Sequence, residues 1–243
     1  MSRPSISKLA VASDKRLPDW GADPTDGASQ RRKVIAALVG PGIVLGLVVA
    51  LFLDVNRGIF VAIVYMVASL TLVWGQGLRV TGWLDARKLR ESEHPRFEHL
   101  VQGLASDIGI PAPELWLIRE GAPNAAVFTA RGPCIAVTSS LLEQYTRTEL
   151  EAVIAHCLLR IARRDVGTAM LANAAWPFDH RLAPRVGYED DVQAAALTRF
   201  PPALAAAIEK AEPRGGRYAG LWFVATGPTH RPVSERVAAL GLL

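Results

Sequence analysis

Two long uncharged stretches dominate the first third of the chain. Residues 34–53 and 59–78 carry no charged side chain, and only Asp54 to Gly58 lies between them. Each stretch has about the twenty residues that an α-helix needs to cross a hydrocarbon core of roughly 30 Å. Buried helices of a soluble protein or a cleaved signal peptide fit such runs less well. The pattern therefore predicts a two-span transmembrane hairpin over residues 34–78.

Basic residues flank this hairpin on both sides. They are Arg31, Arg32, Lys33, Arg79, Arg87, Lys88 and Arg90. The connecting loop holds only Arg57 against Asp54. Because cytoplasmic loops are enriched in Lys and Arg, both termini and the main domain are predicted to lie in the cytoplasm. The predicted location is the cell membrane, in a multi-pass arrangement.

The net charge of +4 is accounted for by these flanking cations. A nucleic-acid surface would interleave basic and aromatic side chains on one face, and no such pattern is present. The predicted partners therefore include the lipid bilayer and exclude nucleic acid. The two cysteines, Cys134 and Cys157, are not expected to form a disulfide in a reducing compartment.

Outside the hairpin the chain divides into two unequal parts. Residues 1–33 are rich in Ser, Pro, Asp and basic residues, which predicts a disordered basic tail. Residues 79–243 mix apolar and polar positions in the manner of a globular domain. The expected class is α+β: the helical hairpin, then a mainly helical domain with a small β-sheet.

Within the domain, short periodic segments predict individual elements. Apolar residues recur at helical spacing over Pro95 to Ile108, with Pro95 in the first turn. Three β-rich runs predict short strands at Glu114 to Ile118, Ala125 to Thr129 and Cys134 to Thr138.

A central helix is predicted to begin after Thr146. Thr146 and Glu149 have the spacing of a capping box. The segment that follows, TELEAVIAHCLLRIARRD, places one apolar stripe along the helix. His156 and Arg160 lie beside this stripe, and because they are four residues apart they share one helical face.

This helix resembles the HExxH helix of zinc proteases, in which two histidines bind the metal and the glutamate is the general base. Further segments follow in the same order: SEHPRFEHLVQGLASDIGIPAPELWLI, APNA, IAVTSSLLEQYTRTELEAVIAH and PTHRPVSERVAAL. Together they resemble the HtpX-type membrane zinc metalloproteases over most of residues 91–240. An intact member of that family is a zinc endopeptidase.

The resemblance breaks at the residues that carry the chemistry. His156 keeps the first ligand position, whereas Cys157 occupies the general-base position and Arg160 the second ligand position. The segment GYEDDVQAAALTRFPPALAAAIEKA resembles the family pattern EYEADxxAAxLTxxPxAL. That register puts Gly187 at the third ligand position and Asp191 at the second-shell aspartate.

These substitutions oppose zinc chemistry. A catalytic zinc needs three protein ligands, and a guanidinium is always protonated and has no acceptor. Loss of a general base typically costs about 10² to 10⁴ in rate. We therefore expect a pseudoprotease with no cofactor, in which His156 is a vestigial ligand. The alternatives are an active zinc metalloendopeptidase in membrane protein quality control, with zinc as cofactor, and a decayed copy without a function.

Two rescues of the site fit less well. A relocated metal could draw on Cys134, Cys157, His156 and His180, but adjacent helical residues point about 100° apart, which separates His156 from Cys157. A cysteine nucleophile at Cys157 would need a base within hydrogen-bond reach. Nothing in the sequence indicates such a base.

Arg160 itself has two interpretations. It either pairs with Asp191 or Glu189 in place of the metal, or it is a solvated arginine on a helix face. Glu189 lies roughly 200° around a helix from Gly187, so it should not replace the missing ligand.

The predicted partner is a polypeptide or a membrane protein. In the family, substrate lies along an edge strand beside the zinc helix. The matching residues here are Asn124, Ala125, Ala126, Val127 and Phe128. Since strand addition uses backbone groups, this edge can bind a polypeptide without catalysis.

Overall fold

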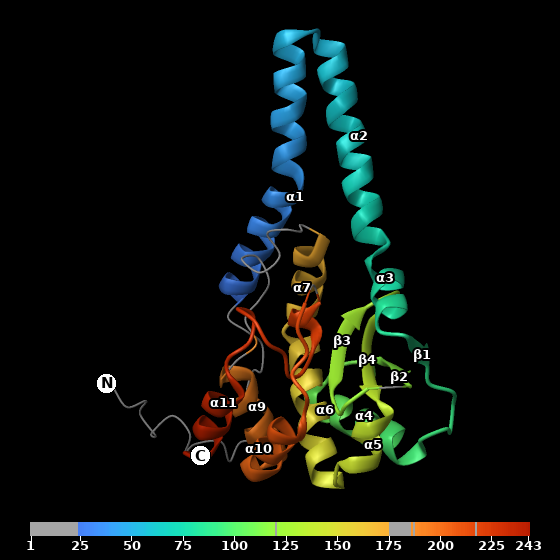
Figure 1. The fold of residues 1–243 in the computed structure, drawn as a ribbon, viewed down its shortest axis with the longest axis vertical. Helices are drawn as coiled ribbons and strands as arrows, with labels where there is room; N and C mark the ends of the chain where they lie inside the picture. The colour runs from blue at the N-terminus through green and yellow to red at the C-terminus, as the bar shows by residue number, and fades with distance from the viewer. Residues whose placement is uncertain (1–23, 120, 175–185, 187, 217) are drawn as a thin grey trace.

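The computed structural model describes residues 24–119, 121–174, 186, 188–216 and 218–243. Two long helices project from one end of a mixed domain (Figure 1). The first helix, α1 (Pro24–Phe52), already begins at Pro24. Residues 24–33, predicted as part of the tail, are therefore helical, and the rest of the predicted tail lies outside the described residues.

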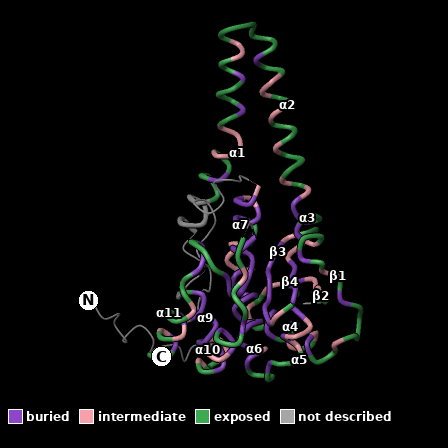
Figure 2. The backbone as a smooth tube through the Cα atoms, in the orientation of Figure 1, coloured by how far each residue is buried: buried purple, intermediate pink, exposed green. Residues whose placement is uncertain are grey.

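The helical hairpin has the predicted form. Helix α2 (Val55–Trp74) follows α1, and Asp54 caps it by accepting a hydrogen bond from Asn56 N at 3.1 Å. Both helices are long and apolar enough to cross a membrane, and only 17% and 6% of their most apolar windows are buried. Exposed and intermediate residues predominate along them (Figure 2). A bilayer would cover these exposed apolar side chains.

The two helices approach each other closely through small residues. A Cβ added at Gly58 would lie 2.5 Å from both the Gly46 carbonyl oxygen and the Ala50 side chain. Only a glycine fits that space. The Gly42 and Gly46 pair of α1 therefore faces α2 of the same chain, since a Cβ at Gly42 would likewise meet the ring of Tyr65.

A four-stranded mixed sheet forms the centre of the domain, in the order β1-β2-β4-β3. Its strands are β1 (Ala86–Lys88), β2 (Glu114–Ile118), β3 (Ala125–Thr129) and β4 (Pro133–Thr138). Strand β4 is parallel to β2 and antiparallel to β3, with Val127 opposite Ile135. The α+β prediction is confirmed, and the three predicted strands are present. Strand β1 was not predicted, because three residues carry too little pattern.

Helices cover both faces of the sheet, so β3 is buried on both sides. Helices α4 (Pro95–Ile108), α6 (Arg147–Ala162) and α10 (Pro201–Lys210) share one hydrophobic cluster with Val127 and Ile135. Helices α3 (Gln76–Trp83) and α7 (Asp165–Ala174) share the other with Phe128 and Ala136. Alternate residues of the strand thus enter opposite clusters, as the two-residue period of a strand requires.

Four further elements are described in this domain. They are α5 (Ser139–Gln144), α9 (Tyr188–Thr198), the 3₁₀ turn η2 (Ala219–Leu221) and α11 (Val233–Leu240). Helix α9 packs against α6, and α11 packs against α9 and α10. The central helix thereby lies between the sheet and the carboxyl-terminal helices, with its middle residues fully buried.

The capping box at the start of α6 is present as predicted. The Thr146 hydroxyl accepts from Glu149 N, and the Glu149 carboxylate accepts from Thr146 N at 2.8 Å. Lys210 of α10 also donates to Glu149, with Nζ 2.7 Å from Oε1. One carboxylate therefore fixes the first turn of α6 and joins it to α10.

Replacing Thr146 with Ala should destabilise the domain by about 1 kcal/mol, because an amide of the first helical turn loses its acceptor. Urea unfolding of the full chain in detergent measures the change. The matched variant Thr148→Ala, at an exposed position in the same turn, should stay within about 0.5 kcal/mol of the parent. Equal losses in both variants would contradict the capping role.

The pH dependence of stability should include a contribution from Glu149. Burial raises its pKa, but the hydrogen bonds from Lys210 and Thr146 outweigh burial and hold the pKa below the ordinary value of 4.5. A carboxyl whose pKa is lowered by folding stabilises the protein above its unfolded pKa, and this contribution is lost as pH falls through the folded value. Glu149→Gln should therefore lower stability at pH 7 and weaken its decline below about pH 4.5. Identical pH profiles of unfolding for the two proteins would contradict this.

Candidate functional site

His156 lies at the centre of the predicted site and is completely buried on α6. Its Nδ1 is 3.2 Å from Asp191 Oδ1, although neither ring nitrogen has a well-aligned hydrogen-bond partner among the described residues. The ring makes a T-shaped contact with Phe223, with centroids 5.1 Å apart. Burial lowers the pKa of His156, against the opposing effect of Asp191. The imidazole is therefore neutral at pH 7.

Asp191 belongs chiefly to an ion pair that the sequence did not predict. Its carboxylate accepts from Arg236 Nε and Nη2, both at 2.7 Å, and both side chains are buried. Burial raises the pKa of Asp191, but Arg236 and His156 outweigh it and lower the value to about 2. Arg236 also donates to the Phe223 carbonyl at 2.9 Å. This bidentate pair joins α9 to α11 directly beside His156.

Arg160 is buried, with 1% of its surface exposed, and neither expected environment is correct. Its guanidinium donates to the backbone carbonyls of Gly220 at 2.6 Å, Trp222 at 3.2 Å and Leu221 at 3.4 Å. The predicted pairing with Asp191 or Glu189 is wrong, and so is the solvated alternative. Asp191 forms its ion pair with Arg236 instead. Glu189 is largely exposed and lies 3.9 Å from Arg163. Three carbonyl dipoles satisfy the cation instead of a carboxylate.

The two cysteines lack the surroundings of a nucleophile. Cys157, at the general-base position, is fully buried, and burial raises its pKa to about 12. Burial likewise raises the pKa of Cys134 to about 11. Cys157 packs in the cluster on one face of the sheet and Cys134 in the cluster on the other face. Both thiols are therefore protonated at pH 7, and they do not converge on His156.

Zinc, which the family resemblance implies, does not fit the described part of this site. In the described residues, no three His, Cys, Asp or Glu side chains lie close enough to hold a metal ion. Asp191 is already paired, and Arg160 contributes a positive charge and donors only. Gly187 and His180, which the sequence analysis also considered, lie outside the described residues.

The predicted peptide-binding edge, residues 124–128, is not free in this structure. All five residues have 0% of their surface exposed. Asn124 is held by its own hydrogen bonds, including one from its amide nitrogen to the Val224 carbonyl at 2.8 Å. Phe223 N donates to the Ala125 carbonyl at 2.7 Å, and Trp222 pairs with Ala126 in an antiparallel bridge. A later segment of the chain covers the edge that a partner would use.

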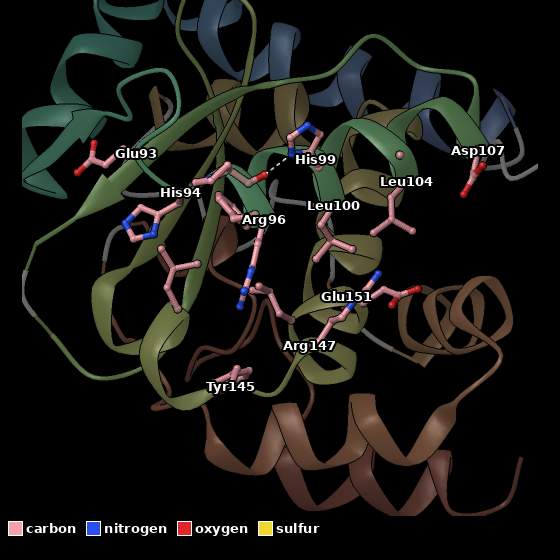
Figure 3. A pocket seen from close by; sticks show the side chains of 15 residues that line it. Glu93, His94, Arg96, His99, Leu100, Leu104, Asp107, Tyr145, Arg147 and Glu151 are labelled. Atoms are coloured by element: carbon pink, nitrogen blue, oxygen red, sulfur yellow. Dashed lines mark hydrogen bonds between the residues drawn. The ribbon is translucent and has the colours of Figure 1, made fainter.

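A cavity lies elsewhere, between α4 and the first turn of α6 (Figure 3). This groove has a volume of about 930 Å³ and contains none of the predicted site residues. Leu100 and Leu150 contribute apolar surface, while Arg96, Arg147 and Glu151 contribute charge. The groove therefore combines charged and apolar lining.

Comparison with known proteins agrees with the motifs. Residues 91–182 match the model of peptidase family M48. The chain is 35% identical over 142 residues to a protease HtpX homolog of Pyrococcus abyssi, covering 56% of this chain and 46% of the relative. Against the protease HtpX homolog of Thermococcus sibiricus it is 42% identical over 102 residues, covering 41% and 35%. The homolog of Lactobacillus helveticus is 31% identical, covering 57% and 46%.

Over these residues the chain is similar to the HtpX-type proteases. It spans less than half the length of these curated relatives. No solved structure matches it. The match to the family model thus covers strands β2 to β4 and the central helix α6, where His156 and Arg160 lie.

Two important residues of this HtpX-type site escaped the sequence analysis. Arg236 holds Asp191, and His230 has Nε2 2.9 Å from the Trp222 carbonyl. Both lie in the segment PTHRPVSERVAAL, which the family comparison had already marked. Burial lowers the pKa of His230 to about 3, and the charge of Arg160 adds to the effect. The resemblance located the segment, but it gave no partners for its side chains.

Replacing Arg236 with Ala should destabilise the domain by about 3 to 5 kcal/mol, because Asp191 would remain buried without its partner. Urea unfolding measures this loss. The control Arg231→Ala breaks an exposed pair with Glu235 near the start of the same helix and should cost at most about 1 kcal/mol. Comparable losses in the two variants would contradict the importance of the buried pair.

Proposed function

We propose that this HtpX-like protein is a pseudoprotease that binds polypeptides without cleaving them. The observation that carries the proposal is the buried guanidinium of Arg160 at the family's second ligand position, bonded to three carbonyls. A fixed cation there repels a metal ion and offers no lone pair. Catalysis would also need a general base, and the buried thiol of Cys157 stands in its place.

The binding role rests on the parts of the family architecture that persist. Strand β3, helix α6 and both hydrophobic clusters are intact, so the scaffold that presents an edge strand is maintained. Strand addition requires backbone groups and not a metal. We further propose that α1 and α2 anchor residues 79–243 to the cytoplasmic side of the cell membrane, on the basis of the flanking cations.

Metal analysis joined to a cleavage assay tests the loss of activity. The purified full chain should contain far less than one zinc per molecule after incubation with zinc and dialysis, and it should leave casein intact. His156→Ala should change neither result, because the imidazole is a vestigial ligand. Stoichiometric zinc and casein cleavage that both disappear in His156→Ala would establish an active peptidase instead.

The binding role has its own measurement. Fluorescein-labelled casein, an unfolded polypeptide, should bind the full chain in lipid nanodiscs and be recovered uncleaved. Nanodiscs without the protein are the control. No binding above that control would contradict the proposed role.

A further inference from the structure

Strand β3 is the last strand of the sheet, and one segment of the chain covers its outer edge. We name residues 219–225 the strap. The strap consists of η2 and the four residues that follow it, and η2 packs against α7. It touches β3 through the Ala126 and Trp222 bridge and the hydrogen bond from Phe223 N to Ala125 O. It therefore occupies the place that an added strand of another polypeptide would take.

Side chains hold the strap more extensively than the sheet does. Each carbonyl from Gly220 to Val224 accepts a hydrogen bond or contacts a polar ring nitrogen. Arg160 donates to the carbonyls of residues 220–222, and His230 Nε2 also contacts the Trp222 carbonyl. Arg236 donates to the Phe223 carbonyl, and the Asn124 side chain donates to the Val224 carbonyl. By comparison, β3 and β4 pair over five consecutive residues of each strand. Beyond its two contacts with β3, the strap is thus held by side-chain donors and by Arg214, whose backbone N–H donates to the Val224 carbonyl at 3.2 Å and which pairs with Ala225 in a parallel bridge.

The strap is buried and carries apolar side chains. Leu221, Trp222 and Phe223 are each at most 4% exposed. Trp222 Nε1 is buried without a hydrogen-bond partner among the described residues. An unpaired buried donor destabilises the closed arrangement. Opening the strap would relieve this cost, and it would free the edge of β3.

We infer that the strap is a displaceable cover over the β3 edge and that Arg160 controls its release. This inference rests on the proposed polypeptide binding and adds its regulation and its ligand class. Once the strap leaves, Arg160, His230 and Asn124 present donors for the carbonyls of an incoming chain. The buried volumes that the side chains of Leu221, Trp222 and Phe223 leave would accept apolar or aromatic side chains of that chain. The ligand is therefore an extended polypeptide with an apolar run, recognised mainly through its backbone.

Arg160→Ala in the full chain in nanodiscs tests the inference. Hydrogen exchange followed by mass spectrometry should show peptides covering 219–225 and 125–129 exchanging about ten- to a hundredfold faster, the effect of losing hydrogen bonds to a charged group. Binding of fluorescein-labelled casein should strengthen in the same variant. The control is Arg163→Ala, at the C-cap of α6, whose partners are Asp165, Asp190 and Glu189. It should leave strap exchange and casein binding unchanged.

Three outcomes overturn the inference. The first is unchanged exchange of the strap in a folded Arg160→Ala variant. The second is faster exchange of the strap in Arg160→Ala without stronger casein binding. Casein binding by the parent protein would still test the proposed function separately. If Arg160→Ala does not fold, exchange of the parent protein in low urea decides. Peptides covering 219–225 should then open before those covering 134–138, and simultaneous opening is the third overturning outcome.

Discussion

The bonding of the Arg160 guanidinium to three backbone carbonyls is the interaction on which the site depends. An isolated buried charge is very unfavourable, so a fully buried arginine persists only where its donors are satisfied. Here the planar fork of the guanidinium meets carbonyl oxygens at 2.6 to 3.4 Å. The bonds join α6 to the strap, and the strap in turn lies on β3. A single side chain thereby connects the central helix to the edge of the sheet.

This connection shows how α6 can be held in place if zinc chemistry is lost, as we propose. A metal ion would hold α6 and α9 together through its ligands. In this protein Arg236 and Asp191 join α9 to α11, and Arg160 joins α6 to the strap. His156 remains between them as a neutral ring, in contact with Asp191 and Phe223. On the proposed reading, the buried cation of Arg160 stands where the family's second ligand would hold a metal ion.

Local patterns predicted much of the fold. Helix α4, strands β2 and β3 and the Thr146 capping box follow from periodicity, proline placement and short-range hydrogen bonding, so they appear with the predicted bounds. The partners of Arg160 and Asp191 could not be predicted in this way. Arg236 is 45 residues beyond Asp191, and the Gly220 carbonyl is 60 beyond Arg160. Every residue has a backbone carbonyl, so residue types do not identify which carbonyls accept hydrogen bonds from Arg160. Acidic residues close to an arginine in the sequence likewise do not identify its partners when it is buried. The cover over residues 124–128 escaped prediction for the same reason, since the strap has no strand-like alternation.

The central claim is that Arg160 fills the place of the metal. Crystals of the protein soaked in zinc and measured above and below the zinc absorption edge test it most directly. The account predicts no anomalous peak within bonding distance of His156, and guanidinium density in contact with the carbonyls of residues 220–222. A zinc peak bound to His156, with Arg160 turned away from those carbonyls, would contradict it.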